Sequence, residues 1–490
     1  MAISTRTTRT KGTVDRSSPR IEVCGASDSP LEVWVRVRGV LNPGKSRGDG
    51  IVAERYFGQF DSEVNRHDPG IKDQVGDIPL IRDRYCHDEE PDCAGCPLVH
   101  HCLHHRSQQK GEGGPSTADL FCGAGGLTLG FEQAGFDSRV AIDLDEWAMR
   151  THAYNRPGHS GASVCADLRM WLDGHPGAEK VDVLMGGPPC QSFSTANRQR
   201  QEEDGRDELY KLFIEAIPRF SPKVLLIENV RGFEKVQPAL CKGIEKHGYV
   251  VKRKKLNARG FGIPQNRARL FTIGVSESWF GDEAGAVVDR ITDRIEEAVR
   301  DNERGLIEAL GGLPEVEASR KRNNTAYESD DTGWTISRAA DRDWNGYLES
   351  INGGSPRPLL VFNHKGRYNN DRDIEIFSRL KPGENSAAES IADIMPYASR
   401  SHIFKDKYYR LLPDKVCKTI TAHMGFDCNM YIHPTQARGL TVREAARVQG
   451  FPDNYVILGT LHSMYKQVGN AVPPPLAKVL AEAILPEVTG

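Results

Sequence analysis

The chain has 490 residues, 38% of them hydrophobic and 27% charged, and its 64 Lys and Arg against 67 Asp and Glu give a net charge of −3. This length predicts two or three folded units, and the near-zero charge excludes a uniformly basic protein, so a nucleic-acid partner would need a local basic patch. No apolar run approaches the ~18 residues that span a bilayer, and eleven cysteines without an evident pairing pattern favour the reducing cytoplasm, with no membrane partner.

The N-terminal region, residues 1–115, is polar and irregular and ends in the linker RSQQKGEGGPS. It contains the stretch CHDEEPDCAGCPLVHHC, with the spacing C-x6-C-x2-C-x5-C. Four thiols so close together in a reducing compartment indicate a metal site rather than disulfides. The expected ligands are Cys86, Cys93, Cys96 and Cys102.

The spacing of these cysteines resembles the iron–sulfur loop of endonuclease III-type DNA glycosylases. That resemblance implies a 4Fe-4S cluster that supports a DNA-contacting loop. Only about 85 residues precede the cluster, which is too few for the glycosylase domain, so we expect no glycosylase activity. Zinc is the alternative, because four thiolates suit both metals and histidines at positions 100, 101, 104 and 105 could join the site.

The next region, residues 116–275, alternates short apolar runs with helical segments. This alternation predicts βαβ units and an α/β fold with a doubly wound, mostly parallel sheet. Ligands bind such sheets outside the carboxyl ends of the strands. There the apolar runs meet a glycine cluster, Asp143, Cys190 and Glu228. We therefore predict one active site at this edge of the sheet.

The C-terminal half divides into two further regions that differ in charge content and in hydrophobic pattern. Residues 276–403 are charge-rich and show no sustained hydrophobic period. In residues 404–490 the segments TVREAARVQGF and PLAKVLAEAIL both predict amphipathic helices.

The stretch DLFCGAGGLTLGFEQAGF (119–136) predicts a strand, a glycine-rich turn and a helix. Asp143 follows at the end of the next predicted strand, where a carboxylate can bind ribose hydroxyls. The glycines lack the G-x-G-x-x-G spacing that serves a pyrophosphate. A nucleoside cofactor without phosphates, such as S-adenosylmethionine, therefore fits better than a dinucleotide.

The stretch MGGPPCQSFS (185–194) places Cys190 directly behind two glycines and two prolines. Glycine allows another molecule to approach the backbone, and proline fixes φ. The pattern indicates a rigid loop that presents a thiol; a proline-rich turn with an incidental cysteine is the alternative reading of these residues. The run LLIENV places Glu228 at the end of a predicted strand, where partial burial favours a protonated general acid.

In order, the motifs of this chain resemble those of the C5-cytosine-specific DNA methyltransferase family, over about residues 117–485. They are DLFCGAGG, AIDLDEWA, CADLR, GGPPCQSFS, LLIENVRGF, GFGIPQNRARLFTIG, KTITAH, LTVREAARVQGFP and QVGNAVPPPLA. The resemblance implies transfer of a methyl group from S-adenosylmethionine to C5 of a cytosine flipped out of duplex DNA. It also implies a catalytic domain at 116–275 and a target-recognition region at 276–403. Residues 404–490 would end that region and return to the catalytic domain.

The resemblance also assigns roles to individual residues. The Cys190 thiolate would add to cytosine C6, which turns the ring into an enamine-like nucleophile. Glu228 would protonate N3, and Asn229 would orient the loop. Arg269 would hold cytosine O2, and Arg267 would support the Cys190 loop.

For the cofactor, the resemblance implies that the GNAV segment (469–472) folds back beside the first glycine loop, and that Asp167 contacts the adenine. The expected cofactor-binding residues are Asp119, Phe121, Gly123, Ala124, Gly125, Gly126, Leu127, Asp143, Asp167, Leu168, Pro189, Asn470 and Val472.

Because the net charge is near zero, binding of nucleic acid would need a local basic patch. Residues 252–269 form such a patch and contain no acid. It predicts phosphate contacts by Lys252, Lys254, Lys255, Arg253 and Arg259. We expect a monomer that acts on double-stranded DNA, with any cognate restriction endonuclease acting separately.

A tRNA cytosine-C5 methyltransferase is the alternative function, since one branch of the family modifies RNA. The roughly 125 residues between FTIGV and the returning order favour duplex DNA over RNA. A binding-only protein is disfavoured because the residues expected to carry the chemistry are present.

Overall fold

The molecule is analysed as a computed structural model. It describes residues 113–156, 163–175, 180–189, 209–300, 303–322, 325, 327–340, 343–354, 358, 360–396 and 407–489. The expected nucleophile Cys190 and the four cysteines expected to bind a metal lie outside these ranges. The predictions about them therefore stay predictions.

The centre of the fold is a seven-stranded sheet with the strand order β3-β2-β1-β4-β5-β8-β6. Neighbours among β1 to β5 run parallel, whereas β8 lies antiparallel to both β5 and β6. The mostly parallel α/β sheet predicted from the sequence is confirmed. The strands are β1 (Ser116–Leu120), β2 (Asp137–Asp143), β3 (Ser163–Cys165), β4 (Val183–Gly186), β5 (Val224–Asn229), β6 (Tyr249–Asn257) and β8 (Ala268–Ser276).

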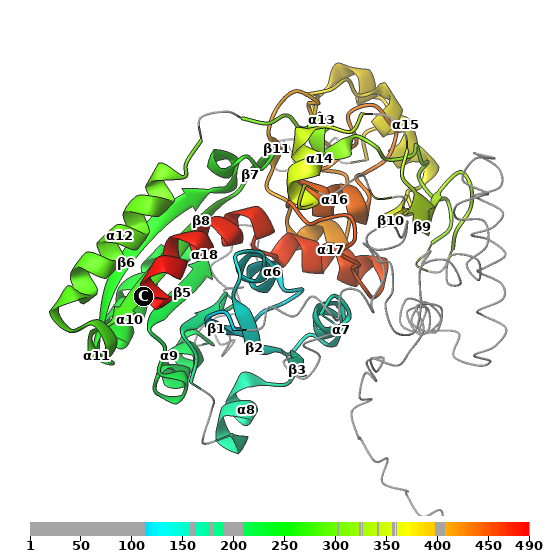
Figure 1. Cartoon of the computed structure of the whole chain (residues 1–490). Helices are drawn as coiled ribbons and strands as arrows, with labels where there is room; N and C mark the ends of the chain where they lie inside the picture. Colours follow the sequence, from blue (N-terminus) through cyan, green and yellow to red (C-terminus); the bar gives the residue numbers. More distant parts are fainter. Residues whose placement is uncertain are drawn as a thin grey trace, which may run out of the picture.

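The central strands are buried because helices cover both faces of the sheet (Figure 1). Every residue of β4 and β5 is buried, as expected for parallel strands covered on both sides. One face packs against α6 (Gly126–Gln133), α12 (Ala284–Glu297) and α18 (Pro474–Thr489). The other packs against α8 (Leu168–Gly174), α9 (Leu209–Phe220) and α10 (Gln237–Glu245). The short α7 (Glu146–Tyr154) contacts β2 and β3, and α11 (Glu277–Phe280) follows β8.

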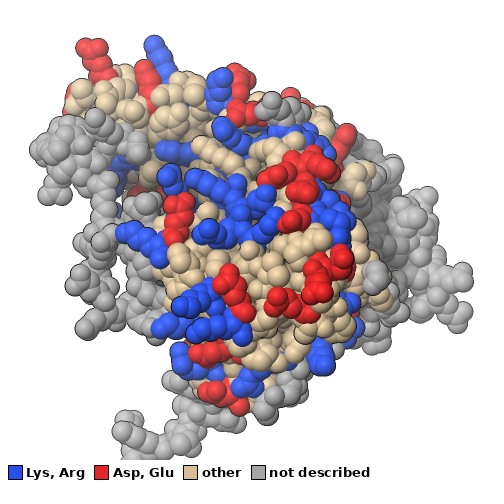
Figure 2. Space-filling model, turned by 90° about the vertical axis from the view of Figure 1, so that its left-hand side faces the viewer, with Lys and Arg blue, Asp and Glu red and all other residues tan. Residues whose placement is uncertain are grey.

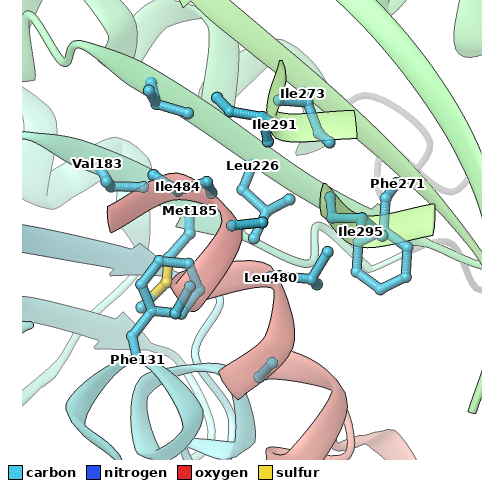
Figure 3. Close-up of a cluster of buried hydrophobic side chains, with 14 of the residues drawn as sticks. Phe131, Val183, Met185, Leu226, Phe271, Ile273, Ile291, Ile295, Leu480 and Ile484 are labelled. Carbon is cyan, nitrogen blue, oxygen red and sulfur yellow. The ribbon is translucent and has the colours of Figure 1, made fainter. Parts of the chain in front are cut away.

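On the sheet face covered by α6, α12 and α18, an early helix of the described chain packs against its last helix. Figure 3 shows Phe131 of α6 beside Leu480 and Ile484 of α18, over side chains of β4, β5 and β8. The helices touch closely: a Cβ built on Gly130 would lie 2.4 Å from the Cβ of Ala477. The C-terminal helix is therefore part of the core that supports the first glycine loop.

A second lobe has its own hydrophobic cluster, built largely from α13, α14, α16 and α17 (Figure 1). This lobe carries an antiparallel pair of strands, β9 and β10. The first lobe is the one that contains the seven-stranded sheet, and the parallel pairing of β11 with β7 joins the two lobes. The elements of the second lobe are α13 (Leu306–Leu310), β9 (Gly333–Arg338), α14 (Gly346–Ile351), β10 (Leu360–Lys365), α15 (Asp371–Arg379), β11 (Cys417–Lys418), η11 (Ala422–Gly425), α16 (Val442–Val448) and α17 (Leu461–Asn470). Strand β7 of the first lobe spans Gln265–Asn266.

Helix α16 differs from the amphipathic helix predicted from TVREAARVQGF, because all seven of its residues are buried. Its charges find partners inside the protein. Arg447 pairs with Asp453 at 2.6 and 2.8 Å, and Arg443 donates to three backbone carbonyls. Buried charges persist when they are paired in this way. Within the described part of the chain, no helix has the length and apolar character of a membrane span.

Candidate active site

The glycine loop after β1 needs glycine for two different reasons. Gly123 and Gly125 have φ of 55° and 81°, a conformation that favours glycine. A Cβ on Gly125 would lie 2.6 Å from the His152 ring. Gly126 opens α6, and a Cβ there would lie 2.2 Å from the carbonyl oxygen of Val472. The GNAV segment therefore packs directly on the glycine loop, as predicted.

Asp143 ties the end of β2 to this loop. Its Oδ2 accepts a hydrogen bond from the Gly123 N–H at 2.9 Å, and its Oδ1 accepts from the Asp145 N–H at 2.8 Å. Burial raises the pKa of the Asp143 carboxyl, and these two backbone donors oppose the rise. Each oxygen keeps a lone pair with which it could accept a further hydrogen bond, such as one from a ribose hydroxyl.

The next residue, Leu144, is an exposed apolar residue that the sequence did not predict at this edge of the sheet. Its side chain is 70% exposed, an unusual position for a large apolar group, and it lies at the same edge of the sheet. The available signal was an apolar residue between two acids directly after a strand.

Asp119 lies fully buried within β1. Its Oδ2 accepts a hydrogen bond from the Thr128 hydroxyl at 2.7 Å, and its Oδ1 has no hydrogen-bond partner among the described residues. Burial raises the pKa of Asp119 to about 7. The Thr128 hydroxyl is also 3.3 Å from Nε2 of His152, whose Nδ1 lies 2.7 Å from the Ser163 hydroxyl. An unsatisfied acceptor thus lies in the strand that leads into the glycine loop.

The other residues expected at the cofactor occupy varied positions. Asp167 caps α8, with its Oδ1 accepting from the N–H groups of Arg169 and Met170, so it has a structural role as well. Leu168 is buried, whereas Pro189 is exposed and is the last described residue before Cys190. The remaining expected positions, Phe121, Ala124, Leu127 and Asn470, lie in the glycine loop, at the start of α6 or at the end of α17.

Glu228 and Arg269 lie diagonally across the antiparallel pair of β5 and β8, in which Glu228 is opposite Phe271. The Arg269 Nε lies 3.0 Å from the Glu228 Oε1, and both side chains are nearly buried, at 13% and 10% exposure. The contact has the distance of an ion pair but not hydrogen-bond geometry, since Oε1 has no hydrogen-bond partner among the described residues. An acid and a guanidinium are therefore held side by side at one strand end.

The loop that leads to Cys190 is attached to the end of β5. The Asn229 side-chain amide donates to the Pro188 carbonyl at 3.0 Å. A Cβ on Gly187 would lie 3.2 Å from the Glu228 Oε2, so the loop backbone passes close to that carboxyl. These contacts fit the loop-orienting role expected of Asn229.

Arg267 is buried and binds the C-terminal part of the chain. Its Nη1 donates to the carbonyls of Ile420 at 2.8 Å and Gly469 at 3.1 Å. Burial, with Arg269 nearby, holds the pKa of Arg267 below its usual range. The hydrogen bonds of its side chain within the described residues thus go to the GNAV segment and to the second lobe. Its expected support of the Cys190 loop stays a prediction.

Gln265, which the sequence did not predict as a site residue, completes the link between Arg267 and the C-terminal part of the chain. Its side chain is fully buried, donates to Gln449 Oε1 at 2.7 Å and accepts from the Ile420 N–H at 2.9 Å. A glutamine two residues before Arg267 was the available signal.

The predicted basic patch lies on the edge strand β6 and the turn that follows it. Three of its five charges have acidic partners on α12 or shortly after it: Lys252 with Asp289, Lys254 with Glu296, and Arg259 with Glu303. Arg253 and Lys255 are exposed, and in a strand they alternate with the paired lysines. Figure 2 shows basic and acidic side chains interspersed over this side of the molecule.

No group of three or more His, Cys, Asp or Glu that could hold a metal occurs among the residues that the structure describes.

Comparison with known proteins identifies the family. The family model for C-5 cytosine-specific DNA methylase matches residues 116–486. The chain is 32% identical over 394 residues to the type II methyltransferase M.DdeI of Desulfomicrobium norvegicum, covering 75% of this chain and 87% of that protein. It is 31% identical over 437 residues to the type II methyltransferase M.AgeI of Thalassovita gelatinovora, covering 75% and 98%.

A solved structure gives the same result. A DNA modification methyltransferase encoded within an E. coli prophage superposes with a TM-score of 0.58 at 25% identity, covering 77% of this chain and all of the other. Fold, site and comparisons together define a methyltransferase with a mostly parallel α/β sheet. The chain belongs to the C-5 cytosine-specific DNA methylase family, and its activity is DNA cytosine-C5 methylation.

Proposed function

We propose that this chain methylates C5 of a flipped-out cytosine within one duplex DNA sequence, through a covalent bond between Cys190 and C6. The observation that carries the proposal is the arrangement at the end of β5. Glu228 lies beside Arg269, and Asn229 is hydrogen-bonded to Pro188, two residues before Cys190.

The chemistry requires each of these groups. Cytosine C5 is a weak nucleophile until a thiolate adds to C6, and that addition places negative charge on the ring. Glu228 supplies the proton that N3 takes up, and Arg269 donates to O2. A base inside a duplex is out of reach of Cys190, so the target nucleotide must leave the stack. After methyl transfer, water takes the C5 proton, and elimination expels the Cys190 thiolate while N3 returns its proton to Glu228.

The proposed cofactor is S-adenosylmethionine, which supplies the methyl group when bound. The residues at the edge of the sheet fit it: a Cβ on Gly123 would meet no atom of the described residues within 4 Å, so the loop is open there, and Asp143 can accept from ribose hydroxyls. Asp119 offers a buried acceptor without a partner among the described residues. Asn470 and Val472 close the site from the C-terminal side, and Asp167 contacts the adenine.

Residues 276–403, with the start of 404–490, form the proposed target-recognition region. Several relatives are named type II methyltransferases, which supports a place in restriction–modification. We propose a cytoplasmic monomer whose cognate endonuclease, where one exists, acts separately.

Methylation-sensitive sequencing tests the activity directly. DNA from cells expressing the wild-type chain should carry 5-methylcytosine at one recurring sequence. DNA from cells expressing Cys190→Ser should not, because the thiol is needed for every turnover. Methylation of tRNA alone, or equal DNA methylation by the variant, would contradict the proposal.

We also propose that the basic patch contacts DNA phosphates, with Lys252, Lys254 and Arg259 exchanging their acidic partners for phosphate. Arg253 and Lys255 need no such exchange with α12. Lys255→Ala should make the slope of log K against log salt shallower by about one unit per lost contact, for cognate and non-cognate DNA alike. An unchanged slope would make the patch an ordinary solvated face.

The four N-terminal cysteines form a proposed 4Fe-4S site, with zinc as the alternative, that supports DNA binding. The support is their spacing, since they lie outside the described residues. Anaerobically purified protein should be yellow-brown, with absorption near ~400 nm; a colourless protein with zinc selects the alternative. Cys93→Ser with Cys96→Ser should weaken DNA binding and leave S-adenosylmethionine binding measurable. Loss of cofactor binding would contradict a separate role.

A further inference from the structure

One buried arginine, Arg156, holds the backbone of the glycine loop from the protein interior. It follows α7 in the chain and is 4% exposed. Its Nη2 donates to the Gly125 carbonyl at 3.1 Å, and its Nη1 donates to the Tyr455 hydroxyl at 3.0 Å. The Tyr455 hydroxyl in turn donates to the Ala124 carbonyl. Arg156 therefore fixes two successive carbonyls of the loop, one directly and one through Tyr455.

Arg156 is itself fixed by further contacts. Its Nε donates to both carboxylate oxygens of Glu132 at 2.9 Å, and its Nη1 also donates to the His152 carbonyl at 3.2 Å. Burial acts to lower the pKa of Arg156, but the Glu132 carboxylate and Tyr455 hold it above its ordinary value. The guanidinium is therefore charged at every working pH, and its rigid fork binds α6, α7 and Tyr455 at once.

The loop needs this support because glycine restricts its own backbone very little. Gly123 and Gly125 have positive φ, and glycine loses more conformational freedom on ordering than any other residue. In a trans peptide the N–H points opposite to the C=O. Because the Gly125 carbonyl is held towards Arg156, the Gly126 N–H points away from it. That N–H opens α6, where the first N–H groups lack partners in the helix and no side chain caps them. Fixing the carbonyls thus fixes the direction of the donors that the loop offers a ligand.

Tyr455 is held as firmly as Arg156. It is 2% exposed, and its carbonyl accepts from Arg443 Nη2 at 2.6 Å. The adjacent Val456 exchanges hydrogen bonds with the side chain of Asn155, at 2.7 and 3.0 Å. The Tyr455 hydroxyl therefore projects from a backbone that is fixed by the second lobe and by the end of α7.

These side chains lie apart from the groups that would carry the chemistry. Glu228 and Arg269 lie on β5 and β8. Within the described residues, the hydrogen bonds of the Arg156 side chain go to α6, α7, the glycine loop and Tyr455. Loss of Arg156 or of the Tyr455 hydroxyl should therefore loosen the loop and leave the acid and the guanidinium in place.

We propose that Arg156 and Tyr455 are positioning residues for the cofactor, which together hold the glycine loop in the conformation that binds S-adenosylmethionine. Both act through the loop backbone. A loop held in its binding conformation lowers the entropy cost of binding. The inference rests on the proposed function, and it adds two residues that none of the roles described above includes.

Two conservative variants test the proposal. Arg156→Lys keeps a charge beside Glu132, but a single ammonium cannot reach Glu132, Gly125 and Tyr455 together. Tyr455→Phe keeps the ring and removes only the hydroxyl. In each variant the KM for S-adenosylmethionine should rise about tenfold, as should the Kd for the product S-adenosylhomocysteine measured by calorimetry. The kcat at saturating cofactor should change by less than about twofold, because the loop affects binding and not the later chemistry.

The double variant gives a second readout. Arg156 and Tyr455 share a hydrogen bond and hold the same loop, so their effects on the Kd should be coupled. Arg156→Lys with Tyr455→Phe should weaken binding by much less than the product of the two single effects. Fully multiplicative effects would contradict a shared support. If Arg156→Lys fails to fold, Tyr455→Phe alone decides through its KM and kcat.

The matched control is Arg410→Lys. Arg410 is a partly buried arginine of the second lobe that donates to the carbonyls of Pro434, Phe377 and Leu380 at 3.0, 3.0 and 2.7 Å. This variant should also lower the melting temperature but keep the wild-type Kd, which separates general destabilisation from positioning of the loop.

A wild-type Kd in both test variants, or a fall in kcat with unchanged KM, would overturn the positioning role alone. Wild-type protein that binds S-adenosylhomocysteine but methylates no DNA would overturn the proposed function, and the Kd values would still decide the role of Arg156 and Tyr455. Wild-type protein that binds no S-adenosylhomocysteine would overturn both.

Discussion

Replacing Asp119 by asparagine should remove a pH dependence from the stability of the fold. Burial raises the pKa of this carboxyl from 3.8 to about 7. The folded state therefore binds the proton more tightly than the unfolded chain. The stabilisation is complete below pH 3.8, is lost as the pH rises towards 7, and is absent above it.

The magnitude follows from the size of the shift. A rise of about 3 pKa units corresponds to about 4 kcal/mol, of which about 3 kcal/mol falls between pH 5 and pH 8. Asparagine mimics the protonated acid and can still accept from the Thr128 hydroxyl. The stability of Asp119→Asn relative to wild type should thus increase by about 3 kcal/mol between pH 5 and pH 8.

The assay is thermal unfolding of both proteins at pH 5 and pH 8. A chain of this length has an unfolding entropy of about 1 kcal/mol per kelvin, so the melting-temperature difference should change by about 3 °C. Asp145→Asn is the control. Its carboxyl caps α7 and pairs with Lys466, which lowers its pKa, so that variant should be destabilised equally at both pH values. A constant difference between Asp119→Asn and wild type would refute the reasoning.

Two further variants test the chemistry and the loop packing. Glu228→Gln keeps the side-chain shape but has no acidic proton to give, so single-turnover methyl transfer should slow by roughly 10²–10⁴ with little change in DNA affinity; normal chemistry with collapsed affinity would contradict the acid role. Gly126→Ala places a Cβ against the Val472 carbonyl and should lower both cofactor affinity and melting temperature, as overpacking does, by about 1–3 kcal/mol. The control is Gly285→Ala in α12, where a Cβ would meet no atom of the described residues within 4 Å. This variant should keep the cofactor affinity and the melting temperature of the wild type, or raise the stability slightly. Equal behaviour of the two variants would count against the packing of Val472 on Gly126.

Local sequence predicted the sheet edge well, because the needed signals are local. Glycines that require positive φ, and polar groups placed directly after apolar runs, bring Gly125, Asp143 and Glu228 to one edge of a parallel sheet. The packing of Val472 on Gly126 was reached through family resemblance, since nothing local links residues so far apart.

Features that depend on distant partners could not be read from local sequence. Arg443 and Arg447 look like surface residues of an amphipathic helix until Asp453 and several carbonyls surround them. Lys254 looks unpaired until α12 brings Glu296 beside it. The antiparallel insertion of β8 between β5 and β6 likewise has no signature in the strands themselves.

The central claim is the covalent bond between Cys190 and the target cytosine, and a fluorinated substrate tests it most directly. Fluorine at C5 cannot leave as a proton does, so elimination is blocked and the adduct accumulates. A duplex pool with 5-fluorocytosine in place of cytosine, incubated with protein and S-adenosylmethionine, should give a complex that survives denaturation. Mass spectrometry should place the methylated nucleotide on Cys190, and Cys190→Ser should give no complex. An adduct on another cysteine, or methyl transfer to ordinary DNA by protein that traps no fluorinated DNA, would contradict the account.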